Sequence, residues 1–79
     1  MIERVKLIWD FRGPNAQAIA EHHAKHLSEF AEIENLQHTI NGHEAITPMH
    51  HIAFLVVEKK LMNTLRETLK PTRGQLYDD

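Results

Sequence analysis

The stretch HIAFLVVE at residues 51–58 constrains the fold most, because it is apolar on both sides of an extended chain. Alternate side chains along a strand point to opposite faces of the sheet. Here both sets are apolar: Ile52, Phe54 and Val56 form one, and Ala53, Leu55 and Val57 form the other. A strand covered on both faces lies in the interior of its sheet. The sequence therefore predicts a central strand that begins at His50 or His51.

Residues 1–12 predict another strand, in which side chains of different character alternate. One apolar face consists of Val5, Leu7, Trp9 and Phe11. The other face carries Lys6, Ile8, Asp10 and Arg12, and it is apolar only in the middle. Gly13-Pro14 ends this strand, so its connection to the next element is short.

Residues 15–34 (NAQAIAEHHAKHLSEFAEIE) predict one long amphipathic helix. A broad apolar arc on the helical wheel contains Ala16, Ile19, Ala20, Leu27, Phe30 and Ala31. Asn15 is a suitable N-cap residue, and Asn35 can end the helix in the left-handed conformation.

The middle of the chain gives weaker signals. In residues 36–40 one set of side chains (Leu36, His38, Ile40) alternates with another (Gln37, Thr39), which predicts a strand, and Asn41-Gly42 predicts a turn. This turn makes a tight hairpin or starts a longer loop, and we favour the loop because Pro48 interrupts a second arm.

Residues 60–70 predict a second amphipathic helix, which Pro71 ends. Its apolar stripe consists of Leu61, Met62, Leu65 and Leu69. Arg73-Gly74 predicts a turn, and residues 75–77 predict a brief edge strand.

The predicted order is βαββα, with a fourth strand if residues 75–77 are extended. This is a ferredoxin-like α+β plan, a single domain over residues 1–79 with two helices on one face of the sheet. A large apolar sheet face is rarely left in water. We therefore expect a homodimer that packs two sheets face to face, unless the N-terminal residues or the tail fold over that face.

The composition excludes several classes of protein. Without cysteine there are no disulfides and no thiolate metal sites. A net charge of −2 argues against a nucleic-acid partner, which needs a basic face. No apolar run is long enough to span a membrane, and the N-terminus lacks the pattern of a signal peptide. We expect no membrane partner and a cytoplasmic location.

Histidine is the unusual residue type, with seven in 79 residues. On the helical wheel His23 lies near the centre of the apolar arc, His26 at its edge and His22 further round. His22 and His26 at i, i+4, or His23 and His26 at i, i+3, share a side of the helix and can bind one metal ion.

A metal site needs further ligands, and the candidates are Asp10 at the end of the first strand and His50 or His51 at the start of the central strand. The predicted ligand set is His22, His23, His26, His51 and Asp10. Imidazole suits zinc, nickel, copper and iron. The alternative is that His23 is a core histidine, hydrogen-bonded to the backbone or to Asp10, with its neighbours on the surface.

Acid–base catalysis is a second hypothesis. His23 or His51 can transfer a proton beside Asp10, because a histidine with a carboxylate partner is a suitable general acid or base. The alternative for His51 is a polar residue at the entry of a strand.

The predicted ligand-binding residues are Trp9, Phe54, Arg12 and Arg73. The aromatic pair can line a pocket for a small molecule, and the two arginines can converge on an anion. The alternatives are that Trp9 belongs to the core or an interface, and that Arg12 forms a surface salt bridge.

A chain of this length, with a strand ending in WDFRGP, a short link to a long helix, two further strands and a second helix, resembles the dimeric α+β-barrel proteins. This group of small, mostly bacterial proteins includes antibiotic-biosynthesis-type monooxygenases, muconolactone-isomerase-like proteins and haem-degrading relatives. The resemblance covers most of the chain and concerns architecture, so it implies a homodimer and no particular catalytic residue. The weak fourth strand departs from the usual pattern.

Three functions are consistent with the sequence. The first is binding of a transition metal or small ligand through the histidines, without catalysis. The second is a cofactor-free enzyme of the monooxygenase or isomerase type. The third is an interaction module with no small-molecule site.

Overall fold

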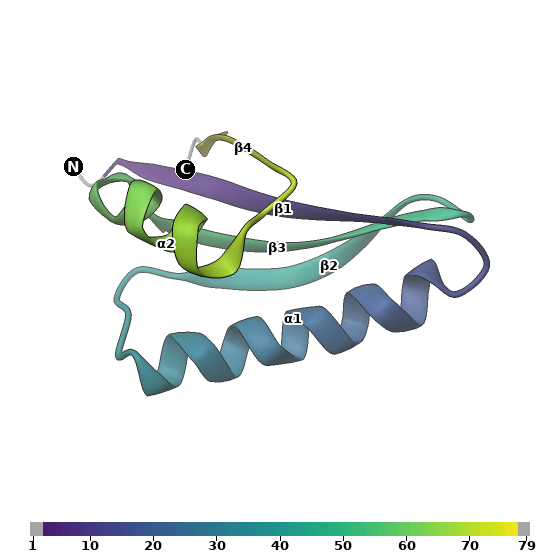
Figure 1. The fold of residues 1–79 in the computed structure, drawn as a ribbon, viewed down its shortest axis with the longest axis horizontal. Helices are drawn as coiled ribbons and strands as arrows, with labels where there is room; N and C mark the ends of the chain where they lie inside the picture. The colour runs from purple at the N-terminus through teal and green to yellow at the C-terminus, as the bar shows by residue number, and fades with distance from the viewer. Residues whose placement is uncertain (1–2, 78–79) are drawn as a thin grey trace.

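The computed structural model describes residues 3–77, so the start of the strand predicted from Met1 lies outside the described residues. The elements are β1 (Arg4–Arg12), α1 (Ala16–Ile33), β2 (Ile40–Thr47), β3 (His50–Glu58), a 3-10 turn (Lys59–Leu61), α2 (Met62–Leu69) and β4 (Arg73–Tyr77). They form an α+β fold in which two helices accompany one four-stranded sheet (Figure 1).

The sheet is antiparallel throughout and has the order β2-β3-β1-β4. The prediction that β3 is central is confirmed, since it pairs with β1 on one side and β2 on the other. The register of the central pair places Arg12 opposite His50 and Trp9 opposite Ala53.

One hydrophobic core lies between the helices and one face of the sheet. Its buried residues are Val5, Leu7 and Trp9 of β1, Ala53, Leu55 and Val57 of β3, Ala24 and Leu27 of α1, and Leu65 of α2. Both helices therefore pack on the same face, and the strand alternation puts the predicted apolar set of β1 towards them.

The opposite face of the sheet, called here the open face, carries Ile8, Asp10, His50, Ile52, Phe54 and Val56. Three of its apolar side chains are buried within the protomer, with 2% of Ile8, 3% of Ile52 and 0% of Val56 exposed. The apolar area available to a second sheet is thus smaller than the residue types alone suggest. Face-to-face dimerisation stays a prediction.

Phe54 provides part of this cover. Its ring lies so close to Gly42 that a Cβ added there would be 3.1 Å from Phe54 Cζ. The ammonium group of Lys6 lies 4.4 Å from the centre of the ring, in a cation–π arrangement. Gly42 in β2 therefore leaves the room that this ring occupies, and Lys6 in β1 contacts the face of the ring.

The predicted strand at residues 36–40 and the turn at Asn41-Gly42 are wrong. β2 begins at Ile40 and runs through both residues to Thr47. Gly42 is needed for the close approach of Phe54, and the Asn41 amide donates to the Ala24 carbonyl at 3.0 Å, so neither residue is free to turn the chain.

The hairpin turns at Pro48-Met49 instead. The Met49 N–H donates to Thr47 Oγ1 at 3.2 Å, and Pro48 is well suited to begin a tight turn.

The predicted left-handed end of α1 is confirmed, because Asn35 has φ 52°. The Leu36 N–H donates to the Ala31 carbonyl at 2.9 Å, and the Asn35 N–H donates to the Glu32 carbonyl at 3.1 Å. These two bonds make a Schellman motif, and the last residue of the motif, Leu36, packs on the core. At the other end Asn15 precedes the helix, but its side chain makes no capping hydrogen bond.

The fourth strand is confirmed and is longer than predicted. β4 pairs with β1 over Arg73–Tyr77, so the predicted turn at Arg73-Gly74 is wrong. The second helix begins with a 3-10 turn and ends at Leu69, close to the predicted bounds.

Across residues 3–77, none of the helices combines the length and the apolar character that a bilayer crossing requires.

Candidate functional site

Two histidines one helical turn apart form a pair on the exposed surface of α1. His22 Nε2 and His26 Nε2 are 3.0 Å apart, and the two rings are nearly perpendicular at 81°. On the other side of the His26 ring, Nδ1 lies 3.5 Å from Glu29 Oε1. The helix therefore holds two imidazole nitrogens towards one point, and a carboxylate lies behind one of them.

The separation of these nitrogens fits adjacent ligands of one metal ion. With metal–nitrogen distances of about 2.0–2.1 Å, two nitrogens bound at 90° lie about 2.9 Å apart, and at a tetrahedral angle about 3.4 Å. The observed 3.0 Å is close to the first value. This distance suits the square-planar or octahedral geometries of nickel and copper. For tetrahedral zinc the two nitrogens would have to move apart to about 3.4 Å.

His23 does not join this pair. Its ring packs against Trp9 at 4.9 Å and Phe11 at 5.5 Å between centroids, and its Nε2 is buried without a hydrogen-bond partner. Burial lowers the pKa of His23, and positive charge on His26 and His22 lowers it further. In this position His23 is a neutral histidine at the edge of the core.

His51 also lies on the helix-facing side of the sheet and is only 7% exposed. Its Nδ1 is buried without a hydrogen-bond partner. Within residues 3–77, no three or more histidine, aspartate or glutamate side chains gather closely enough to hold a metal ion. The structure thus brings together His22 and His26 of the predicted ligand set, and it leaves His51 and Asp10 apart from them.

Asp10 belongs to a different group of residues, on the open face. His50 Nε2 lies 2.7 Å from Asp10 Oδ1. Arg73 donates from Nε to Oδ2 at 3.0 Å and from Nη2 to Oδ1 at 3.2 Å. We call Asp10, His50 and Arg73 the Asp10 cluster. Its carboxylate has both oxygens occupied by donors from two different strands.

The register of the sheet explains why these three side chains meet. Arg12 lies opposite His50, and Ile8 lies opposite Arg73, so Asp10 is the diagonal neighbour of both partners on the same face. The Asp10 N–H also donates to Thr72 Oγ1 at 3.2 Å, which fixes the entry to β4.

The cluster keeps Asp10 ionised. Its side chain is only 12% exposed, and burial alone would raise its pKa. The hydrogen bonds from Arg73 outweigh burial, and with a smaller effect from His50 they lower the pKa of Asp10 to about 2. An ionised carboxylate only accepts hydrogen bonds, so His50 Nε2 carries the proton in their contact.

The sequence-based prediction placed His23 or His51 beside Asp10, whereas in the structure His50 makes that contact. The alternation of side chains shows that the two histidines face opposite ways, but the β1–β3 register decides which one shares a face with Asp10.

The predicted ligand-binding residues separate as well. Trp9 lies in the core and donates from Nε1 to the Leu69 carbonyl at 3.1 Å, while Phe54 lies on the open face. Arg12 is exposed at the end of β1, opposite His50. Trp9 and Phe54 therefore do not line one pocket, and Arg73 is engaged with Asp10.

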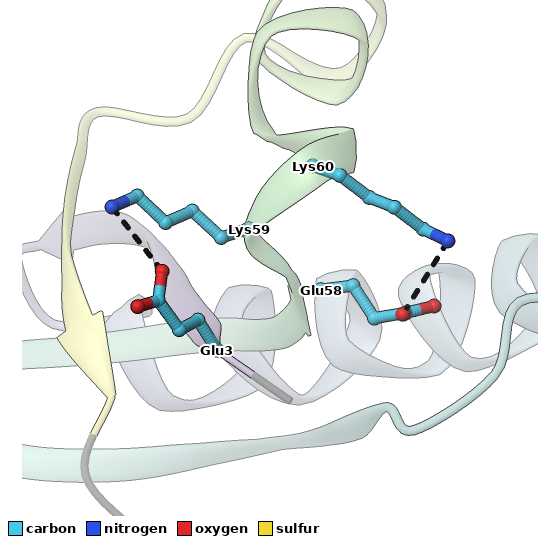
Figure 2. A pocket seen from close by; sticks show the side chains of 4 residues that line it. All are labelled: Glu3, Glu58, Lys59 and Lys60. Atoms are coloured by element: carbon cyan, nitrogen blue, oxygen red, sulfur yellow. Dashed lines mark ion pairs between the residues drawn. The ribbon is translucent and has the colours of Figure 1, made fainter. Parts of the chain in front are cut away.

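A hollow beside the start of β1 offers little to a ligand. It is lined by Glu3, Glu58, Lys59 and Lys60 (Figure 2). Each lysine is paired with a carboxylate, at 3.5 Å for Lys59–Glu3 and 3.7 Å for Lys60–Glu58. Within each pair the two charges already neutralise one another.

No protein-family model, no curated protein and no solved structure matches this chain. The functional argument therefore depends on the geometry of the α1 pair and of the Asp10 cluster.

Proposed function

We propose that this protein binds one divalent transition-metal ion on α1 through His22 and His26. The observation that supports this proposal is the 3.0 Å separation of the two Nε2 atoms. One of these nitrogens donates a hydrogen bond to the other. On metal binding the donor ring's proton would move to its own Nδ1, so that both rings stay neutral and both Nε2 lone pairs are available to the ion.

Glu29 strengthens the proposal. Histidines that bind metals commonly donate their second ring N–H to a carboxylate, which fixes the ring and makes it a better ligand. Glu29 Oε1 lies 3.5 Å from Nδ1 of His26, on the side of the ring where such a carboxylate would be needed. The two histidines fill two coordination positions, so water or another molecule would complete the shell.

The architecture proposed with this function is a ferredoxin-like homodimer. The strand order β2-β3-β1-β4 and the placement of both helices on one face support the fold assignment. The mass of the native particle tests the dimer: a mass of one chain at micromolar concentration would contradict it.

Calorimetric titration tests the metal site. Untagged, chelator-treated protein is titrated with Cu²⁺, Ni²⁺ and Zn²⁺, and we expect one site per chain with copper bound most tightly. His22→Ala and His26→Ala should each weaken binding at least tenfold. Glu29→Gln should weaken it by about tenfold, the lower limit for outer partners of a ligand.

His43→Ala is the matched control, because His43 is an exposed histidine on β2 rather than on α1. This variant should bind metal like the wild type. If His43→Ala and His26→Ala lose affinity equally, or if no ion binds at all, the proposal fails.

A second candidate function is proton transfer at His23 or His51. The supporting observation is that each has one buried ring nitrogen without a hydrogen-bond partner. Buried polar groups are nearly always satisfied, so a small ligand is a plausible partner for these atoms. A stabilising small molecule whose effect disappears in both His23→Phe and His51→Phe would support it; a ligand screen with no such compound would count against it.

A further inference from the structure

We propose that the Asp10 cluster, together with Arg12, is a binding site for an oxyanion, a phosphate or carboxylate group of a small molecule, on the open face of the sheet. This site lies on the opposite face from the histidine pair of α1 and is independent of metal binding.

The first argument is the supply of hydrogen-bond donors. A guanidinium group has five N–H donors in a planar fork, and Arg73 uses one from Nε and one from Nη2 for Asp10. Nη1 takes no part in this contact, and the Arg73 side chain is 48% exposed. The outer edge of this guanidinium can therefore receive an oxyanion while its inner edge stays on Asp10.

His50 supplies the second group. Its Nε2–H is held by Asp10, which leaves Nδ1 as the nitrogen for a ligand. The neutral ring accepts a hydrogen bond at Nδ1 from a monoprotonated phosphate, and the protonated ring donates a hydrogen bond from Nδ1 to a dianion or carboxylate. Since the tautomer is fixed by an ionised partner, His50 needs no rearrangement in either case.

Arg12 brings a second guanidinium to the same end of the sheet. Its Cα is paired with that of His50, and strand alternation puts both side chains on the face of Asp10. Arg12 and Arg73 carry two positive charges on this face, and Asp10 and Glu44, which lies opposite Ile52 in β2, carry two negative charges. Both Asp10 oxygens are occupied and leave no ligand position for a cation, whereas the outward N–H groups of Arg73 remain available as donors to an anion.

Asp10 acts as a positioning residue. Long cationic side chains lose rotamer entropy when they bind a ligand, and a site that holds them beforehand binds more tightly. With a side chain that is 12% exposed, Asp10 orders Arg73 and His50 before any ligand arrives. An isolated surface salt bridge would join Asp10 to one partner only, whereas here Asp10 holds two.

The test is titration with inorganic phosphate, phenyl phosphate and benzoate, followed in ¹H–¹⁵N spectra of the arginine and histidine side chains. Chelator is present, and the ionic strength is kept constant with chloride so that screening does not mimic binding. We expect saturable shifts at Arg73 and His50. Phenyl phosphate binding without benzoate binding assigns the ligand as a phosphate, and the reverse assigns it as a carboxylate.

Arg73→Gln should lose at least tenfold in affinity, and Arg73→Lys should lose an intermediate amount, because lysine keeps the charge without the planar fork. Arg12→Gln should also lose several-fold, and this exposed residue can be changed without breaking the Asp10 contacts. Arg66→Gln, on the exposed side of α2, is the control and should bind like the wild type.

Asp10→Asn separates preorganisation from simple attraction. If charge alone matters, removal of this negative charge should strengthen anion binding. Because Asp10 acts as a positioning residue, we expect the substitution to weaken anion binding instead. Absence of saturable shifts with all three anions, or equal affinities for wild type, Arg12→Gln and Arg73→Gln, would overturn the proposal whatever the outcome of the metal titration.

Discussion

His50 and Asp10 are joined across the two central strands, with 2.7 Å between Nε2 and Oδ1, although 40 positions separate them in the sequence. Arg73 reaches the same carboxylate from β4. One acidic side chain thus connects three of the four strands, and it should affect stability as well as ligand binding.

The first prediction concerns the loss of this carboxylate. Asp10→Asn should reduce the free energy of unfolding at pH 7 by about 2 kcal/mol, because charged hydrogen bonds to Arg73 and His50 are lost at a mostly buried position. Urea denaturation measures the change.

Acid titration provides the check on this value. The pKa of Asp10 falls from 3.8 to about 2 on folding, so its stabilisation is complete above about pH 5 and is lost as the pH falls from about 5 to about 2. Wild type and Asp10→Asn should therefore converge in stability near pH 2. A difference that stays constant down to pH 2 would show that the charge is not responsible.

The second prediction concerns His23. Its pKa is lowered in the folded protein, so the unfolded chain binds a proton more readily and stability falls as the pH decreases below about 6.5. His23→Phe keeps a ring against Trp9 and Phe11 and removes the proton. The denaturation midpoint of this variant should depend less on pH between 7 and 5 than that of the wild type.

The control for His23 is again His43→Ala, an exposed histidine outside the core. It should retain the pH dependence of the wild type. Equal pH dependence in wild type and His23→Phe would mean that another group titrates on unfolding.

The third prediction concerns the ring of Phe54. Gly42→Ala places a methyl group 3.1 Å from Phe54 Cζ, which forces the ring to move and should cost about 1–3 kcal/mol. Gly74→Ala is the matched strand control, since its nearest contact is 3.7 Å from the new Cβ. Thermal unfolding of both variants measures the difference, and a Gly42→Ala protein as stable as Gly74→Ala would show that the Phe54 ring is not confined.

The fourth prediction concerns the end of α1. Asn35 has φ 52°, a conformation that costs other non-glycine residues about 1–2 kcal/mol. Asn35→Ala should lower the free energy of unfolding by about 1 kcal/mol, and Asn35→Gly should leave it unchanged or slightly higher. Urea denaturation that ranks alanine at or above glycine here would contradict the Schellman motif.

The periodic elements could be predicted from the sequence, because their patterns reflect burial directly. The two-faced apolar run of β3 identified a central strand, and the helical spacing of α1 identified both its length and its end at Asn35. In β2, Gly42 resembles a turn residue, and its real constraint is the ring of a residue on the neighbouring strand. No local pattern contains that contact.

The candidate sites also differ in whether the sequence alone could predict them. The His22–His26 pair follows from i, i+4 spacing alone, so the sequence could predict it. The Asp10 cluster depends on the register of β1 against both neighbours. A shift by one residue in β1–β3 pairing would present His51 to Asp10 instead of His50.

The strand order has a consequence for synthesis. β1 is translated first, yet both of its neighbours, β3 and β4, are translated later. Until they emerge from the ribosome, the apolar residues of β1 can pack only on α1, and its backbone groups remain unpaired. The nascent protein should depend on the early docking of α1, or on a chaperone, to avoid aggregation during this interval.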